Sequence, residues 1–213
     1  MATPNDIAIE DMTGTWYMQG LSWFVRKAIG LATVTIKLTQ APGTNPSTSA
    51  PTIEITVLQS TGTSLGATTD KLYLDWTELK RDDNIFGKTF AQARFVTGAP
   101  SSDGKTRPDL NVQTKVDDPN IAKFLRGEIG EDLKPCEGFL VEAPKKEFPG
   151  VNGQAGLWTQ VLIRSQDGKW TAEQIWGFEI INGVRHYVRR TAVTDDKGKF
   201  QLGRVVYTFK GRD

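Results

Sequence analysis

Apolar and polar residues alternate along most of the chain, in short runs that turn residues separate. The segment 52–59 places isoleucine and valine on one face, and the segment 71–78 alternates in the same way. Turn residues at 81–84 precede another alternating run over 85–96, and a further strand is expected over 109–116. Because successive side chains of a strand point to opposite sides, this period of two predicts β-strands with one buried face.

The C-terminal third has the same alternation with tight turns between the runs. It begins at Gly156, with Asp-Gly at 167–168, Asn-Gly at 182–183 and a further turn at 195–198. Asn-Gly and Asp-Gly between alternating runs are typical of two-residue hairpin turns, because they tolerate positive φ. This part of the chain therefore predicts an antiparallel meander.

Two segments have a helical period instead. Apolar residues recur three and four positions apart over 21–29, and Gly30 stands where a left-handed cap would end a short helix. A second helix is expected after Asp118, which is a good N-cap residue, with Pro119 in its first turn and Gly127 at its end. The second helix interrupts the series of strands as an insertion.

These elements predict an all-β fold of about ten strands, with one short helix after the first strand and one short helical insertion. Closing the sheet into a barrel removes the exposed edge strands that an open sheet would leave. We predict one up-and-down antiparallel β-barrel domain over residues 1–213, with residues 1–12 flexible. A barrel of this size has room for one small ligand in its lumen.

Composition narrows the possible partners and compartments. The chain has 26 Lys and Arg against 25 Asp and Glu, so it lacks the positive charge that nucleic acid or an acidic membrane would attract. Cys136 is the single cysteine and cannot form an internal disulfide. Residues 1–12 lack the apolar run of a signal peptide, and no apolar span approaches the length of a membrane helix. We expect a cytoplasmic protein without membrane insertion.

The first strand and the helix after it carry a family resemblance. Gly14-Thr15-Trp16 resembles the opening of a calycin barrel, the superfamily of lipocalins and fatty-acid-binding proteins. The segment 20–27 resembles the helix of fatty-acid-binding proteins, with a shortened connection before it, and an alternating strand follows in both. The sequence is most similar to small fungal lipocalin-like proteins of natural-product pathways. The resemblance covers roughly the first 40 of 213 residues, and it implies a barrel that binds a small hydrophobic molecule.

The strand over 169–181 has an aromatic face that we expect to point into the lumen. Gln174 is the amide on that face, and it could orient a ligand carbonyl or hydroxyl or bond to neighbouring protein groups. On the next strand, 184–194, both alternating sets contain arginine, so parity does not decide which set faces inward. The expected ligand-binding residues are Trp16, Phe24, Trp76, Phe90, Trp158, Trp176, Phe178 and Tyr207.

Arginine near the C-terminus has two possible roles. Fatty-acid-binding proteins hold a carboxylate with Arg-x-Tyr, but here Arg204 and Tyr207 are one residue too far apart to face the same side of a regular strand. Lipocalins instead pack an arginine over the tryptophan of the first strand. By that resemblance, Arg190 or Arg204 could lie over Trp16.

No common catalytic motif is present. The chain contains no nucleophile elbow, Walker loop or dinucleotide fingerprint, and one His with one Cys does not make a usual zinc site. We expect no metal and no cofactor. The candidate catalytic residues are Gln174, His186 and Arg190, where histidine is the side chain that ordinarily titrates near neutral pH. Other polar candidates, more often structural than functional, are Tyr73, Asp75, Glu173, Tyr187 and Tyr207.

Three functions remain open at this point. The first is a cofactor-free cyclase or isomerase, such as a pericyclase of Diels–Alder type, acting on an apolar natural-product intermediate in the lumen. The second is a carrier that binds a small hydrophobic ligand without changing it. The third is a barrel filled by its own side chains.

Overall fold

The computed structural model of the protein describes residues 2–19, 35–60, 67–83, 86–145 and 155–212. The first predicted helix, and Phe24 with it, lies outside these residues. The elements are β1 (Gly14–Gln19), β2 (Thr35–Thr44), β3 (Pro51–Ser60), β4 (Ala67–Tyr73), β5 (Leu79–Asp83), β6 (Gly87–Pro100), β7 (Thr106–Pro108), α2 (Pro119–Arg126), β8 (Leu157–Ser165), β9 (Trp170–Ile181), β10 (Val184–Asp195) and β11 (Phe200–Gly211).

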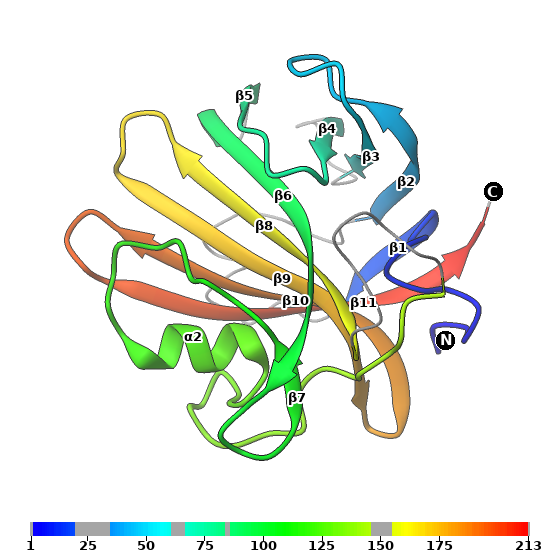
Figure 1. Cartoon of the computed structure of the whole chain (residues 1–213), viewed down its shortest axis with the longest axis vertical. Coiled ribbons are helices and arrows are strands. Elements are labelled where there is room, and N and C mark those ends of the chain that lie inside the picture. Colours follow the sequence, from blue (N-terminus) through cyan, green and yellow to red (C-terminus); the bar gives the residue numbers. More distant parts are fainter. Residues whose placement is uncertain (1, 20–34, 61–66, 84–85, 146–154, 213) are drawn as a thin grey trace.

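Within the described residues, ten antiparallel strands follow one another around a nearly closed barrel (Figure 1). Their order is β4-β3-β2-β1-β11-β10-β9-β8-β6-β5, and β7 pairs with β6 outside this path. The first and last strands of the chain are neighbours, because β1 pairs with β11. The two ends of this strand order, β4 and β5, leave a gap in the barrel. Beyond the end of β4, the N–H of Trp76 donates to the carbonyl of Ala93 on β6 at 2.8 Å, and this hydrogen bond links the two sides of the gap. The predicted all-β barrel is confirmed.

Local sequence signals account for the hairpins and for the described helix. In the β9–β10 turn, Asn182 and Gly183 have φ of 51° and 75°, as a two-residue turn of this hand requires. At the start of α2, the N–H of Asn120 donates to Asp118 Oδ1 at 2.8 Å, and Gly127 ends the helix with φ of 79°. The predictions of these turns and of this helix are confirmed.

The prediction of a strand over residues 109–116 is wrong. The structure gives this segment no ladder, and the backbone N–H groups of Gln113 and Thr114 donate instead to the carboxylate of Glu173, at 2.8 and 3.3 Å. A buried side chain on β9 therefore supplies acceptors that a neighbouring strand would otherwise supply.

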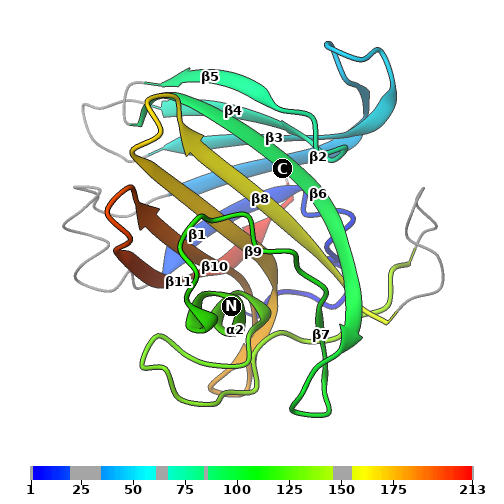
Figure 2. The same cartoon turned by 60° about the vertical axis from the view of Figure 1, so that its left-hand side comes forward.

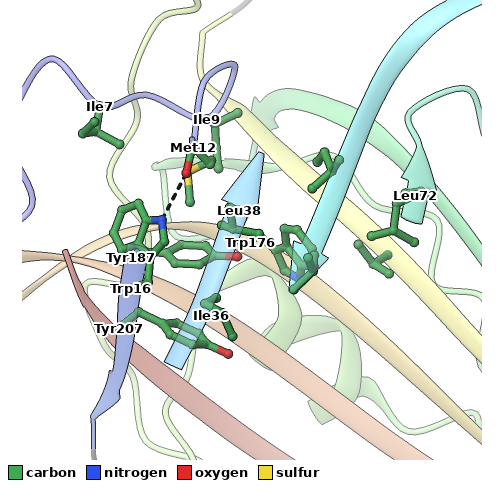
Figure 3. Packing of buried hydrophobic residues seen from close by; sticks show 14 of the residues in the cluster. Ile7, Ile9, Met12, Trp16, Ile36, Leu38, Leu72, Trp176, Tyr187 and Tyr207 are labelled. Atoms are coloured by element: carbon green, nitrogen blue, oxygen red, sulfur yellow. Dashed lines mark hydrogen bonds between the residues drawn. The ribbon is translucent and has the colours of Figure 1, made fainter. Parts of the chain in front are cut away.

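The apolar residues form two separate cores. The interior core lies inside the barrel, and the N-terminal residues Ile7, Ile9 and Met12, which we expected to be flexible, are buried in it around Trp16 (Figure 3). The Trp16 indole N–H donates to the carbonyl of Met12 at 3.0 Å.

The outer core lies between the barrel wall and α2, which covers the outside of β9 and β10 (Figure 2). Among the described residues, no helix has the length and hydropathy that crossing a membrane requires.

Candidate ligand site in the barrel interior

The inward faces of β9 and β10 form one wall of the barrel interior. Trp176 and Phe178 of β9 belong to the interior core, so the aromatic face of this strand points inward as the alternation indicates. On β10, Tyr187 belongs to the same core, while Val188 belongs to the outer core. Because side chains alternate along a strand, Arg189 faces the interior with Tyr187.

Arg189 lies among aromatic rings. Its guanidinium carbon is 3.9 Å from the ring centroid of Trp176 and 5.1 Å from that of Tyr207. Its Nε donates to the hydroxyl of Tyr187 at 2.6 Å. Its Nη2 has almost no surface open to solvent and no hydrogen-bond partner among the residues that the structure describes.

Nothing around Arg189 in the described structure neutralises its positive charge. Burial raises the pKa of Tyr187 and of Tyr207, so both phenols are neutral at physiological pH. No ion pair joins Arg189 to a carboxylate of the described residues. At Arg189 the interior wall therefore carries a cation in aromatic surroundings, with no carboxylate partner among the described residues.

Gln174 precedes Trp176 by two residues on the same inward face. The indole N–H of Trp176 donates to Gln174 Oε1 at 2.8 Å, which fixes the orientation of the carboxamide. The amide oxygen is used by the protein, whereas the NH2 group has no protein acceptor among the described residues. Gln174 is half-buried and so can present that donor to a molecule in the barrel.

The remaining interior candidates lie closer to the end of the barrel that the N-terminal segment covers. Trp16 packs edge-on against Tyr187 with ring centroids 5.1 Å apart, and Tyr207 stacks on Tyr187 at 4.9 Å (Figure 3). The guanidinium carbon of Arg185 lies 3.7 Å from the ring centroid of Phe178. Of the predicted site residues, the structure thus brings together Gln174, Trp176, Phe178, Tyr187, Tyr207 and Trp16.

Three predicted site residues lie on the outer side of the barrel wall instead. Trp158 packs near Phe139, and both belong to the core beneath α2. His186 has its Nδ1 3.3 Å from the carbonyl oxygen of Tyr207, on the outward face of β10. Arg190 is fully buried on that same outward face. None of the three lies beside Gln174 and Trp176.

The partners of Arg190 show what it does there. Its Nε donates to Glu179 at 2.6 Å, and its Nη1 donates to the carbonyls of Phe124 and Ile129 at 3.1 and 2.6 Å. Arg204 binds the other oxygen of Glu179 at 3.2 Å. The expectation that Arg190 or Arg204 lies over Trp16 is therefore wrong, because both face away from the interior.

Two further predicted aromatic residues lie on the outside of β6. Ala91 and Ala93 of this strand face the interior, so Phe90 and Arg94 face outward. The guanidinium of Arg94 lies 4.3 Å from the ring centroid of Trp76, which places Trp76 outside as well. Among the described residues, no group of three or more His, Cys, Asp or Glu is arranged to hold a metal ion.

The strand order and the interior wall define a class: a nearly closed antiparallel β-barrel, ten strands in the described residues, compatible with a calycin-like fold. No family model matches the sequence, and searches of curated proteins and of solved structures find no significant match. The closer resemblance to fungal lipocalin-like proteins stays a prediction.

Proposed function

We propose that the barrel interior binds a small molecule with a mainly apolar body, and that the protein acts on it as a cofactor-free cyclase or isomerase. One observation carries this proposal, the pairing of Trp176 with Gln174 on the interior wall. Because the indole N–H holds the amide oxygen at 2.8 Å, the NH2 group of Gln174 remains to donate to a ligand.

A unimolecular rearrangement suits such a wall. Flat aromatic surfaces hold a flexible apolar molecule in one reactive conformer, and this lowers the entropic part of the barrier. A fixed amide donor stabilises negative charge that develops on a carbonyl oxygen in the transition state. A pericyclic reaction of Diels–Alder type needs no proton transfer, so it does not require His186, which faces outward.

The binding part is tested with N-phenyl-1-naphthylamine, a neutral apolar probe whose fluorescence rises on burial. We expect Trp176→Ala to weaken probe binding at least about tenfold, as loss of a central aromatic contact does. Trp158→Ala is the matched control, because it removes the same side chain from the outer core. Equal effects of the two variants, or no binding by the wild type, would overturn the proposal. Trp176→Phe serves if the alanine variant does not fold.

The catalytic part is tested by incubating the protein with an organic extract of its source and separating the products chromatographically. A compound of unchanged mass and new retention time, formed faster than without protein and more slowly by Gln174→Leu, supports the reaction. Retention and release of a compound that stays unchanged would identify a carrier instead. The same interior wall would serve a carrier, so this comparison is what separates the two functions.

A further inference from the structure

The chain between β7 and α2 crosses the outside of β8 and β9 as a strap, residues 109–116 (Figure 2). No strand ladder holds the strap to the wall. The backbone of its middle is held by the Glu173 carboxylate of β9, which accepts the N–H groups of Gln113 and Thr114 at 2.8 and 3.3 Å. Near its start, Leu110 is buried in the outer core. The strap therefore depends on one acidic side chain for its backbone contacts with β9.

Glu173 has no surface open to solvent beneath the strap. Its third donor is the side-chain NH2 group of Gln160 on β8, at 2.6 Å, and Ala192 lies opposite it on β10. The charged side chain that faces it is Arg94 of β6, whose Nε donates to Gln160 Oε1 at 2.8 Å. No ion pair neutralises Glu173 within the described part of the chain. An ionised carboxylate enclosed in this way is costly, even with its hydrogen bonds made.

The strap itself completes this enclosure, so its position and the ionisation of Glu173 are linked. Burial raises the pKa of Glu173, and the hydrogen bonds and the charge of Arg94 lower it without offsetting that effect. When the strap lifts, water reaches the carboxyl and its pKa returns toward the ordinary value of 4.5. Because the closed strap raises the pKa, binding a proton and closing the strap favour each other.

We propose that the strap is a pH-dependent latch, which closes over the neutral carboxyl of Glu173 and opens more readily once this carboxyl is ionised. The helix that follows is held to the wall separately, because Arg190 donates to the carbonyls of Phe124 and Ile129. Opening is therefore confined to the strap, and it uncovers the part of the outer core that Leu110 occupies. The proposal does not require a ligand in the barrel.

Amide hydrogen exchange of the full chain, followed by NMR from pH 4 to pH 8, tests this latch. We express protection as the exchange rate of each amide relative to its rate in an unstructured peptide at the same pH. In the wild type, protection of Gln113 and Thr114 should fall by up to about tenfold for each pH unit between 4.5 and the raised pKa of Glu173, and then level off. Glu173→Gln keeps an acceptor oxygen and cannot ionise, so its protection should not change with pH.

Leu140 supplies the matched control amide. It also ties a segment without a ladder to β9, but its N–H donates to the carbonyl of Phe178, at 2.7 Å, and not to a carboxylate. Its protection should stay constant with pH in both proteins. If Glu173→Gln does not fold, the comparison of Gln113 and Thr114 with Leu140 within the wild type still decides. Protection of the two strap amides that is constant or rises with pH, or that changes equally at Leu140, would overturn the latch.

Discussion

Arg189 and Arg190 are neighbours on β10, and their side chains lie in opposite environments. Arg190 is held in the outer core by Glu179 and two backbone carbonyls, so it stabilises the contact between the barrel and α2. Arg189 faces the interior, where the described residues offer it aromatic rings and one phenol. The first arginine is structural, whereas the second has no carboxylate partner among the described residues.

Replacing each arginine with methionine should therefore have different effects on the free energy of unfolding. Arg190→Met leaves Glu179 buried without its closest partner and should destabilise the protein by about 3–5 kcal/mol. Arg189→Met removes a charge that has no counter-ion among the described residues, and it should leave stability unchanged or raise it by about 1 kcal/mol. Urea unfolding of the two variants measures both values. A loss of similar size in Arg189→Met would show that Arg189 is a structural residue too.

At the scale of elements, a covered outer face explains which predictions failed. The hairpin at 182–183 and the cap at Asp118 were predictable, because turn and cap residues act within a few positions of themselves. Which face of β10 points inward was not predictable from the sequence, because α2 buries the outward residues of this strand while the interior buries the inward ones. With both faces buried, the alternation of apolar and polar residues no longer marks the interior. Trp158 was assigned to the lumen for the same reason.

The segment 109–116 depends on one titratable side chain. Burial raises the pKa of Glu173 above its ordinary value, even though Gln113, Thr114 and Gln160 donate hydrogen bonds to it. The folded protein therefore holds this proton more tightly than the unfolded chain does. The contribution of Glu173 to stability is present in full below its ordinary pKa of 4.5, and is lost as the pH rises through the raised value.

Glu173→Gln removes this titration and so provides the comparison. Stability of the wild type relative to the variant should fall as the pH rises from below 4.5 through the raised pKa of Glu173, by about 1.4 kcal/mol for each pH unit by which the pKa is raised. Urea midpoints across this range measure the difference, and the other carboxylates cancel because both proteins contain them. Parallel profiles would contradict the account of Glu173.

At the scale of the whole molecule, the barrel separates two tasks. The outer core binds α2 and the chain around Cys136 to the wall, through Arg107 and Arg190. The interior is packed at one end by the N-terminal segment around Trp16, and further along it carries the polar groups of Gln174 and Arg189. The barrel was predictable from its alternation and turns. The site was only partly predictable, because identifying Arg189 as an interior residue requires knowing which face of β10 points inward.

The central claim is that a ligand occupies the interior beside Trp176. The chain has six tryptophans, and the indole N–H signals of a 15N-labelled sample report on each of them, assigned through single Trp→Phe variants. Titration with N-phenyl-1-naphthylamine should shift the signal of Trp176 most and leave that of Trp158, in the outer core, in place. A shift of Trp158 with Trp176 unchanged would place the ligand outside the barrel and contradict the account.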